Sequence, residues 1–274
     1  VFLSMETNSI TNAIILAGGK GTRFSEQTKT LPKPLIKVGP DAAIVHIIRH
    51  FVENGVTNIF IAGGYKFNLL AQELSKVFNP IECNSDSFKV ISNNEDAIYK
   101  AKVTVIDTGY ETGTALRIKK VLQYMKESEI PLKTFVTYGD TFSDVNLYNV
   151  SKQLEETKTN AVITAVNFRE RFGIMKVNGN SDKLITKFAE KSQSVDEFIN
   201  GGFIAVDETL IEHIHDTDDD FSKDTLPRLQ KMERLGAYIH DGFWFAMDSQ
   251  RDWEEITKIY KENPSNFLKQ KENN

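Results

Sequence analysis

The sequence predicts an α/β fold with a mostly parallel, mixed central sheet. Short apolar runs alternate with amphipathic stretches over most of the 274 residues, a pattern typical of strands connected by helices. The first run, residues 13–17, is apolar throughout and is followed by glycines, which indicates a buried strand whose end opens into a binding loop. Hydrophobic residues make up 40% of the chain, which is enough for a sizeable core.

The expected elements follow from the spacing of apolar residues. Ile44, Ile47, Ile48 and Phe51 would share one face of a helix over residues 43–53. The same periodicity predicts further helices over residues 65–78, 114–126 and 252–261. Apolar runs predict strands in the first half over residues 58–62, 103–106 and 134–138.

The pattern changes beyond about residue 160, where helices become few. The predicted strands of this part are residues 161–168, 174–177, 184–188 and 203–206. We therefore expect a smaller antiparallel or mixed region here. Since no linker rich in Pro, Gly or Ser separates the halves, the prediction is one domain over residues 12–262, with halves 12–159 and 160–262 and with tails 1–11 and 263–274. Two polar stretches, 84–96 and 216–223, are predicted surface loops, and the run Asp218-Asp219-Asp220 is interpreted as solvated.

Composition excludes several partners. Thirty-three basic and 38 acidic residues give a net charge of −5, so no overall field favours nucleic acid or an anionic membrane. The single cysteine, Cys83, excludes a disulfide framework and fits a reducing compartment. No signal peptide and no apolar run of membrane-spanning length is found, so a soluble, cytoplasmic protein is expected.

The most informative motif is the glycine-rich stretch at residues 16–23, which is followed by Pro32-Lys33-Pro34. Gly18, Gly19 and Gly21 have no side chains to block a polyphosphate, and their backbone N–H groups can converge on one anion. It is neither a dinucleotide fingerprint nor a P-loop, because Phe24 replaces the third glycine and Gly21 replaces Ser or Thr. A long loop without helical or strand period is usually functional. We predict a nucleoside triphosphate site, with Arg23 and Lys33 adding positive charge.

Bound polyphosphate calls for a divalent cation, and Mg²⁺ prefers one or two carboxylates together with water and phosphate oxygens. Asp140 and Asp248 each follow an apolar run, although either could instead be a helix cap or a turn residue. Glu190 and Lys191 are candidates for a sugar and its phosphate, or else a solvated charge pair. The Asn200-Gly201-Gly202 segment is either a turn or a close backbone approach to a ligand.

Taken together, these residues resemble the sugar-1-phosphate nucleotidylyltransferases, from about residue 12 to residue 253. The final signature, from Asp241 to Asp252, points to the branch that transfers a cytidylyl group to glucose 1-phosphate. The other segments that carry the resemblance are 16–23 with 32–34, 105–109, 137–140, 190–191 and 200–203.

The resemblance implies a Rossmann-like three-layer α/β/α nucleotidyltransferase fold with a sugar-phosphate-binding second half. It implies that the sugar phosphate attacks the α-phosphorus of CTP in line and that pyrophosphate leaves. No general base is needed, and positioning and charge neutralisation should dominate. The implied catalytic residues are Arg23, Lys33 and Asp140, and the implied Mg²⁺ ligands are Asp140 and Asp248. The implied nucleotide-binding residues are Leu16, Ala17, Gly18, Gly19, Gly21, Thr22, Arg23, Lys33, Thr108 and Thr114. The implied sugar-phosphate-binding residues are Tyr138, Gly139, Glu190, Lys191, Asn200 and Gly201.

The chain departs from the cytidylyl pattern at three places. Residues 114–117 read Thr-Ala-Leu-Arg where that branch has Thr-Gly-Gly-Arg, Ser192 replaces a proline, and Thr141 replaces a glycine. Another nucleotide (UTP, dTTP or GTP) or another sugar 1-phosphate is therefore the alternative.

Two further alternatives belong to other classes of protein. A catalytically silent regulatory or nucleotide-sugar-binding subunit would lack the charged positions, which are retained here. A glycosyltransferase would carry an Asp-x-Asp motif, which residues 140–142 do not supply. The aromatic cluster Phe243-Trp244-Phe245 could serve a core or the interface of the expected homo-oligomer.

Overall fold

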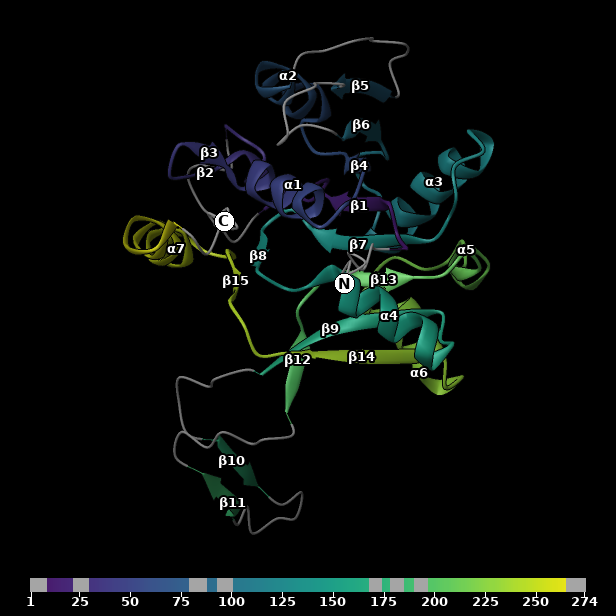
Figure 1. The fold of residues 1–274 in the computed structure, drawn as a ribbon. Helices are drawn as coiled ribbons and strands as arrows, with labels where there is room; N and C mark the ends of the chain where they lie inside the picture. Colours follow the sequence, from purple (N-terminus) through teal and green to yellow (C-terminus); the bar gives the residue numbers. More distant parts are fainter. Residues whose placement is uncertain are drawn as a thin grey trace, which may run out of the picture.

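A nine-stranded mixed sheet forms the centre of the protein (Figure 1). The computed structural model describes residues 9–21, 30–78, 88–92, 101–167, 174–177, 185–189 and 197–264. The strand order in the sheet is β12-β9-β13-β7-β1-β4-β6-β5, and β14 pairs with β9. The predicted α/β fold with a mostly parallel mixed sheet is confirmed.

The first half supplies the parallel part of the sheet. Its parallel strands are β1 (Asn12–Leu16), β4 (Asn58–Gly63), β6 (Lys102–Asp107) and β7 (Thr134–Tyr138). Every residue of β1 is buried, because strands lie on both sides of it and helices cover both faces. An antiparallel strand, β5 (Phe88–Ser92), closes the edge beside β6. The prediction of a surface loop over residues 84–96 was therefore wrong for residues 88–92.

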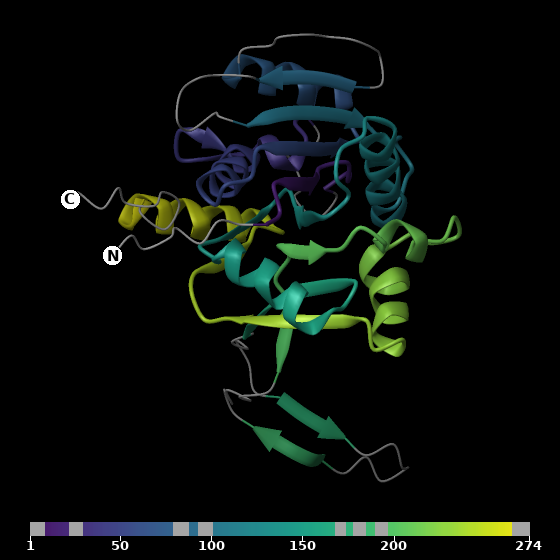
Figure 2. The same cartoon turned by 45° about the vertical axis from the view of Figure 1, so that its right-hand side comes forward.

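The second half extends the same sheet as a mixed region. Strand β13 (Ile204–Val206) pairs antiparallel with both β7 and β9 (Ala161–Asn167), so the sheet passes from one half to the other without interruption. Strand β12 (Phe198–Asn200) is antiparallel to β9, and β14 (Leu235–His240) is parallel to it. A separate hairpin, β10 (Ile174–Val177) with β11 (Ile185–Ala189), stands apart from this sheet in Figures 1 and 2.

Helices cover both faces of the sheet and make the predicted three-layer α/β/α arrangement. The helices packed on one face are α1 (Ala43–Glu53), α2 (Phe67–Val77) and α4 (Leu147–Thr157). Those on the other face are α3 (Thr114–Glu127), α5 (Leu210–His213) and α6 (Leu226–Lys231). The predicted apolar face of α1 is buried, and Phe51 lies against Phe135 and Phe203 with ring centroids 6.1 and 5.6 Å away.

A third apolar cluster lies beside the sheet and joins distant segments of the chain. It contains Ile36, Phe142, Met247 and Ile256. The elements around it are η2 (Lys33–Leu35), β2 (Lys37–Val38), β3 (Asp41–Ala42), β8 (Thr141–Ser143), β15 (Trp244–Ala246) and α7 (Gln250–Glu262). Because β8 and β15 pair antiparallel, residues 140 and 248 are brought to one place. None of the helices in the described parts of the chain is long and apolar enough to cross a membrane.

Candidate active site

A cavity of about 350 Å³ opens where β1 and β7 end. This is the carboxyl edge of the parallel strands, where α/β proteins commonly bind ligands. The predicted site residues that line it are Leu16, Ala17, Gly18, Gly19, Gly21, Lys33, Thr114, Tyr138, Gly139 and Asp140. The lining residues that were not among the predicted site residues are Pro34, Thr112, Gly113, Arg117, Asp219 and Asp220.

The three glycines of the loop after β1 differ in their surroundings and in their backbone conformation. A Cβ on Gly18 would collide with the guanidinium of Arg117, so a larger residue there would displace this hydrogen-bonded side chain. A Cβ on Gly19 would meet nothing within 4 Å, which leaves this backbone open toward the cavity. Gly21 has φ +61°, a left-handed conformation that glycine adopts without strain. The loop is therefore both packed against the protein and accessible to an anion.

Arg117 ties together the chain at the carboxyl ends of three neighbouring strands, β1, β4 and β6. Its guanidinium donates to the carbonyls of Gly18, Gly63 and Gly109 at 2.8–3.0 Å, and to the hydroxyl of Thr108 at 2.6 Å. Burial lowers the pKa of Arg117, and nearby Asp107 partly opposes this effect. Thr108 is completely buried and lies behind the cavity wall as a partner of Arg117. Arg117 keeps the cytidylyl pattern, as Thr114 does, and this marks it as a candidate site residue although the pattern does not show its contacts with backbone carbonyls.

The structure brings together Lys33, Asp140 and Asp248. The Nζ atom of Lys33 lies 2.5 Å from an oxygen of Asp140 and 2.8 Å from one of Asp248. Asp140 follows β7, Asp248 follows β15, and the amide of Met247 donates to the carbonyl of Asp140 at 3.0 Å. Burial lowers the pKa of Lys33, but the two carboxylates outweigh burial and raise the pKa above 10.5. Lys33 is therefore an ammonium ion at neutral pH.

Two carboxylates that meet at one cation are a suitable donor set for Mg²⁺. Both are hard oxygen ligands, and this metal commonly takes one or two carboxylates and fills its octahedron with water and phosphate oxygens. Within the described residues no group of three or more His, Cys, Asp or Glu side chains could hold a metal. Asp140 and Asp248 thus fit a metal that enters with a phosphate ligand.

Tyr138 lines the cavity and belongs to a small hydrogen-bond network. Its hydroxyl is 2.9 Å from the hydroxyl of Ser222, and the Asn200 amide donates to the Tyr138 oxygen at 3.3 Å. Burial raises the pKa of Tyr138, so the phenol stays neutral. The carbonyl of Gly201 accepts from the indole of Trp244 at 2.8 Å. Asn200 thus contacts Tyr138, and neither Asn200 nor Gly201 is among the residues that line the cavity.

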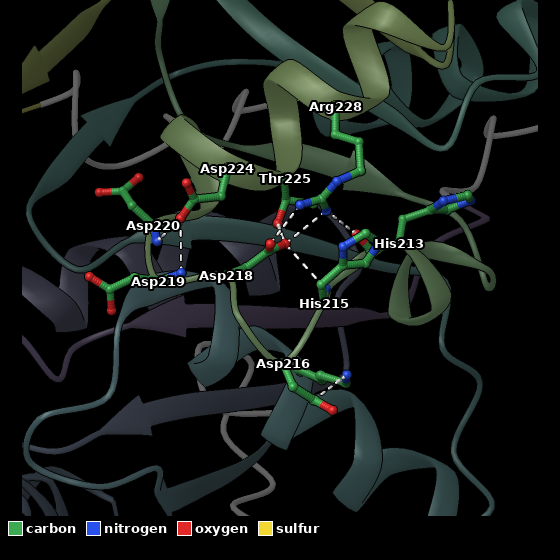
Figure 3. Close-up of polar contacts among 10 residues, drawn as sticks. His213, His215, Asp216, Asp218, Asp219, Asp220, Asp224, Thr225 and Arg228 are labelled. Carbon is green, nitrogen blue, oxygen red and sulfur yellow. Dashed lines mark hydrogen bonds and ion pairs between the residues drawn. The ribbon is translucent and has the colours of Figure 1, made fainter.

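The prediction that residues 218–220 are solvated was wrong for Asp218, whereas Asp219 is exposed and Asp220 partly exposed. Asp218 is 3% exposed and makes a bidentate ion pair with Arg228, at 2.6 and 2.9 Å, which holds the Asp218 pKa at about 2. Figure 3 shows Asp219 and Asp220 pointing away from this pair, and both line the cavity. The sequence suggested only an acidic run, because the partner of Asp218 lies on the following helix.

The 219–225 segment docks on the first turn of α3. The backbone carbonyl of Asp219 accepts from the amide of Ala115 at 3.1 Å, and the amide of Phe221 donates to the hydroxyl of Thr114 at 2.8 Å. A Cβ on Gly113 would collide with Asp219, which explains the glycine there. The segment continues as a π-helical turn over Phe221–Thr225, an irregularity frequent at functional sites.

Thr22, Arg23, Glu190 and Lys191 lie outside the described residues, as does Cys83. Their predicted roles stay predictions.

The family model of the nucleotidyl transferases matches residues 12–262 of this chain. The chain belongs to the nucleotidyl transferase family.

Two relatives and one solved structure are similar to this chain over most of its length. This nucleotidyltransferase is 30% identical to the glucose-1-phosphate cytidylyltransferase of Salmonella typhimurium, over 91% of this chain and 94% of that one. It is also 30% identical to the probable glucose-1-phosphate cytidylyltransferase of Bacillus subtilis, over 91% of this chain and 96% of that one. The crystal structure of HddC from Yersinia pseudotuberculosis has the same fold, with a TM-score of 0.63 at 21% identity, covering 92% of this chain and all of that one.

These matches confirm the predicted family and the resemblance to its cytidylyl branch. They also confirm that this nucleotidyltransferase has the fold of its family.

Proposed function

We propose that this enzyme transfers CMP from CTP to glucose 1-phosphate and releases pyrophosphate. The observation that carries the proposal is the meeting of Lys33, Asp140 and Asp248 at one end of a cavity lined by a glycine-rich loop. The choice of CTP and glucose 1-phosphate is supported by the two cytidylyltransferases that resemble this chain over nine tenths of its length. The alternative is a different substrate pair, with UTP, dTTP or GTP as the nucleotide or with another sugar 1-phosphate.

In this proposal the described residues position and neutralise the reacting phosphates. The backbone of Gly18 to Gly21 receives the polyphosphate, and the Lys33 ammonium offsets charge near the α-phosphorus. Mg²⁺, held by Asp140 and Asp248, would supply further charge neutralisation. No base is assigned, since the attacking phosphate oxygen is already anionic at neutral pH.

The remaining site residues are proposed by family resemblance. Thr22 and Arg23 would contact the triphosphate, and Glu190 and Lys191 the sugar phosphate. Tyr138, with Asn200 and Gly201 behind it, would complete the sugar side. A homo-oligomer and a cytoplasmic location are proposed as well, the first from the partly exposed aromatic residues 243–245 and the second from the single cysteine.

Pyrophosphate release by the purified protein, measured over a panel of nucleoside triphosphates and sugar 1-phosphates, tests the proposal. The highest kcat/KM is expected for CTP with glucose 1-phosphate. Lys33→Ala should keep the fold but lower turnover by about a hundredfold, since one transition-state charge contact contributes roughly 3 kcal/mol. Near-normal turnover in this variant would contradict the role of Lys33. No release with any pair would favour a silent subunit.

A further inference from the structure

The two carboxylates suited to a metal are already bonded to one cation of the protein itself. Lys33 donates to both Asp140 and Asp248, and only 12% of its side chain is exposed. Asp248 is the more open partner, with 56% of its side chain exposed. The ammonium therefore lies between the carboxylates, at the place where a shared metal ion would lie.

Lys33 is fixed in this position by its backbone. It begins a short 3₁₀ turn in which the amide of Leu35 donates to the carbonyl of Pro32 and that of Ile36 to the carbonyl of Lys33. Pro34 packs so closely on Gly139 that a Cβ there would come within 3.0 Å of the proline ring. The amine thus comes from one rigid segment and the carboxylates from two others.

A metal that took both carboxylates without other changes would leave the Lys33 ammonium largely buried and without an anionic partner. Removing one member of a buried ion pair is costly, because the remaining charge loses its compensation. A bound triphosphate would change this balance, since Lys33 and the glycine loop line the same cavity and phosphate oxygens held there would take over the charge of Lys33. The same event brings the phosphate oxygens that complete a Mg²⁺ octahedron.

We propose that Lys33 occupies the metal position in the nucleotide-free enzyme, and that it releases Asp140 and Asp248 to the metal only when a triphosphate accepts its charge. The metal would then bind with the nucleotide and not before it. This inference rests on the proposed function, because it needs a triphosphate in the glycine-lined cavity. It assigns Lys33 a second role, as an internal counter-ion that keeps the site ordered and closed to free metal.

Direct Mn²⁺ binding tests this role without turnover. Free Mn²⁺ is measured by electron paramagnetic resonance in titrations of the wild type, Lys33→Met and Lys33→Arg, with circular dichroism to show that each is folded. We expect the nucleotide-free Lys33→Met protein to bind Mn²⁺ at least tenfold more tightly than the wild type. Lys33→Arg keeps a cation and should bind as weakly as the wild type.

Two controls locate the effect. Adding Asp140→Asn to Lys33→Met should abolish the tight binding, because one of the two carboxylates is lost. Lys119→Met removes another lysine ion pair, formed with Asp216 at 2.7 Å, and should leave Mn²⁺ binding unchanged. A CTP analogue with a methylene α–β bridge should tighten Mn²⁺ binding strongly in the wild type and much less in Lys33→Met.

Nucleotide-free Lys33→Met that binds Mn²⁺ no more tightly than the wild type would overturn the counter-ion role. The counter-ion role would also be overturned if the CTP analogue increased Mn²⁺ affinity equally in the wild type and in Lys33→Met. The proposed function is judged separately, by pyrophosphate release from the wild type. A protein with the Lys33→Met effect but without pyrophosphate release would refute that function and retain the counter-ion role.

Discussion

Asp218 is a buried carboxylate on which one wall of the cavity depends. It accepts from Arg228 at 2.6 and 2.9 Å and from the hydroxyl of Thr225 at 2.8 Å. Asp218→Asn should lower the free energy of unfolding by about 2 kcal/mol, less than for a fully buried pair because Arg228 is partly exposed. It should also raise the substrate KM, since Asp219 would lose its support. Urea unfolding and steady-state kinetics measure the two effects, and Asp216→Asn, whose side chain is 91% exposed, should change neither.

Asp218 also makes the free energy of unfolding depend on pH, in a direction that follows from its pKa. The pKa of Asp218 is lowered from 3.8 to about 2, chiefly by its hydrogen bonds with Arg228. Its contribution to stability is therefore present above pH 3.8 and is lost as the pH falls through the folded-state pKa. The difference between wild type and Asp218→Asn should be constant near neutral pH and shrink in strong acid. A difference that vanished already at neutral pH would refute the ion-pair account.

At the scale of elements, the paired strands β8 and β15 set the distance between Asp140 and Asp248. A hydrogen-bond network closes the other end of this ladder, where the Nε2 atom of His240 lies 3.1 Å from an oxygen of Asp144 and 3.1 Å from the carbonyl of Phe243. Burial would lower the pKa of His240, but these hydrogen bonds and the charges of Asp144 and Asp241 raise it above 6.5. The imidazolium is thus the form that the network stabilises.

His240→Gln should cost about 1–2 kcal/mol of stability in mildly acidic solution and less in alkaline solution. The pKa of His240 is raised in the folded state, so its contribution is complete below pH 6.5 and is lost as the pH rises through the folded-state value. Urea unfolding of both proteins at a series of pH values measures this. His215→Gln, a change at an exposed side chain, should show no such trend. A cost for His240→Gln that grew with pH would contradict the sign.

The elements that the sequence predicted well are those with a strong local pattern. Helix α1 and strand β7 have the predicted bounds, because each has an apolar pattern that decides its structure. Strand β14 was missed: it contains a glycine and its residues are all at least partly exposed, so neither alternation nor an apolar run marks it. Helix α4 was also missed, although its buried residues at 147, 150 and 154 have helical spacing and Asn146 caps it.

Prediction of the site from the sequence was likewise limited to residues with a local pattern. Lys33, Asp140 and Asp248 could be predicted together, because each belongs to a motif or follows an apolar run. The roles of Arg117 and Asp219 could not, since Arg117 binds backbone carbonyls at the ends of three strands and Asp219 packs on Gly113, which is far away in the sequence. Contacts of backbone atoms across the chain leave no pattern in the sequence.

At the scale of the whole molecule, the uninterrupted sheet predicts that the two halves unfold together. Strand β13 pairs with β7 of the first half and β9 of the second, so neither half can lose its strands alone. Both tryptophans belong to the second half of the sequence but contact the first half, Trp244 through β8 and Trp253 through the carbonyl of Lys37, so their fluorescence reports on the junction of the halves, whereas circular dichroism reports on both halves. The two signals should give one coincident transition in urea.

Leu74→Ala changes a fully buried site on α2 in the first half. It should lower the urea midpoints of both signals equally, at a cost of about 3 kcal/mol. A fluorescence midpoint that stayed unchanged in Leu74→Ala would show that the halves are separate folding units and would refute the single domain over residues 12–262.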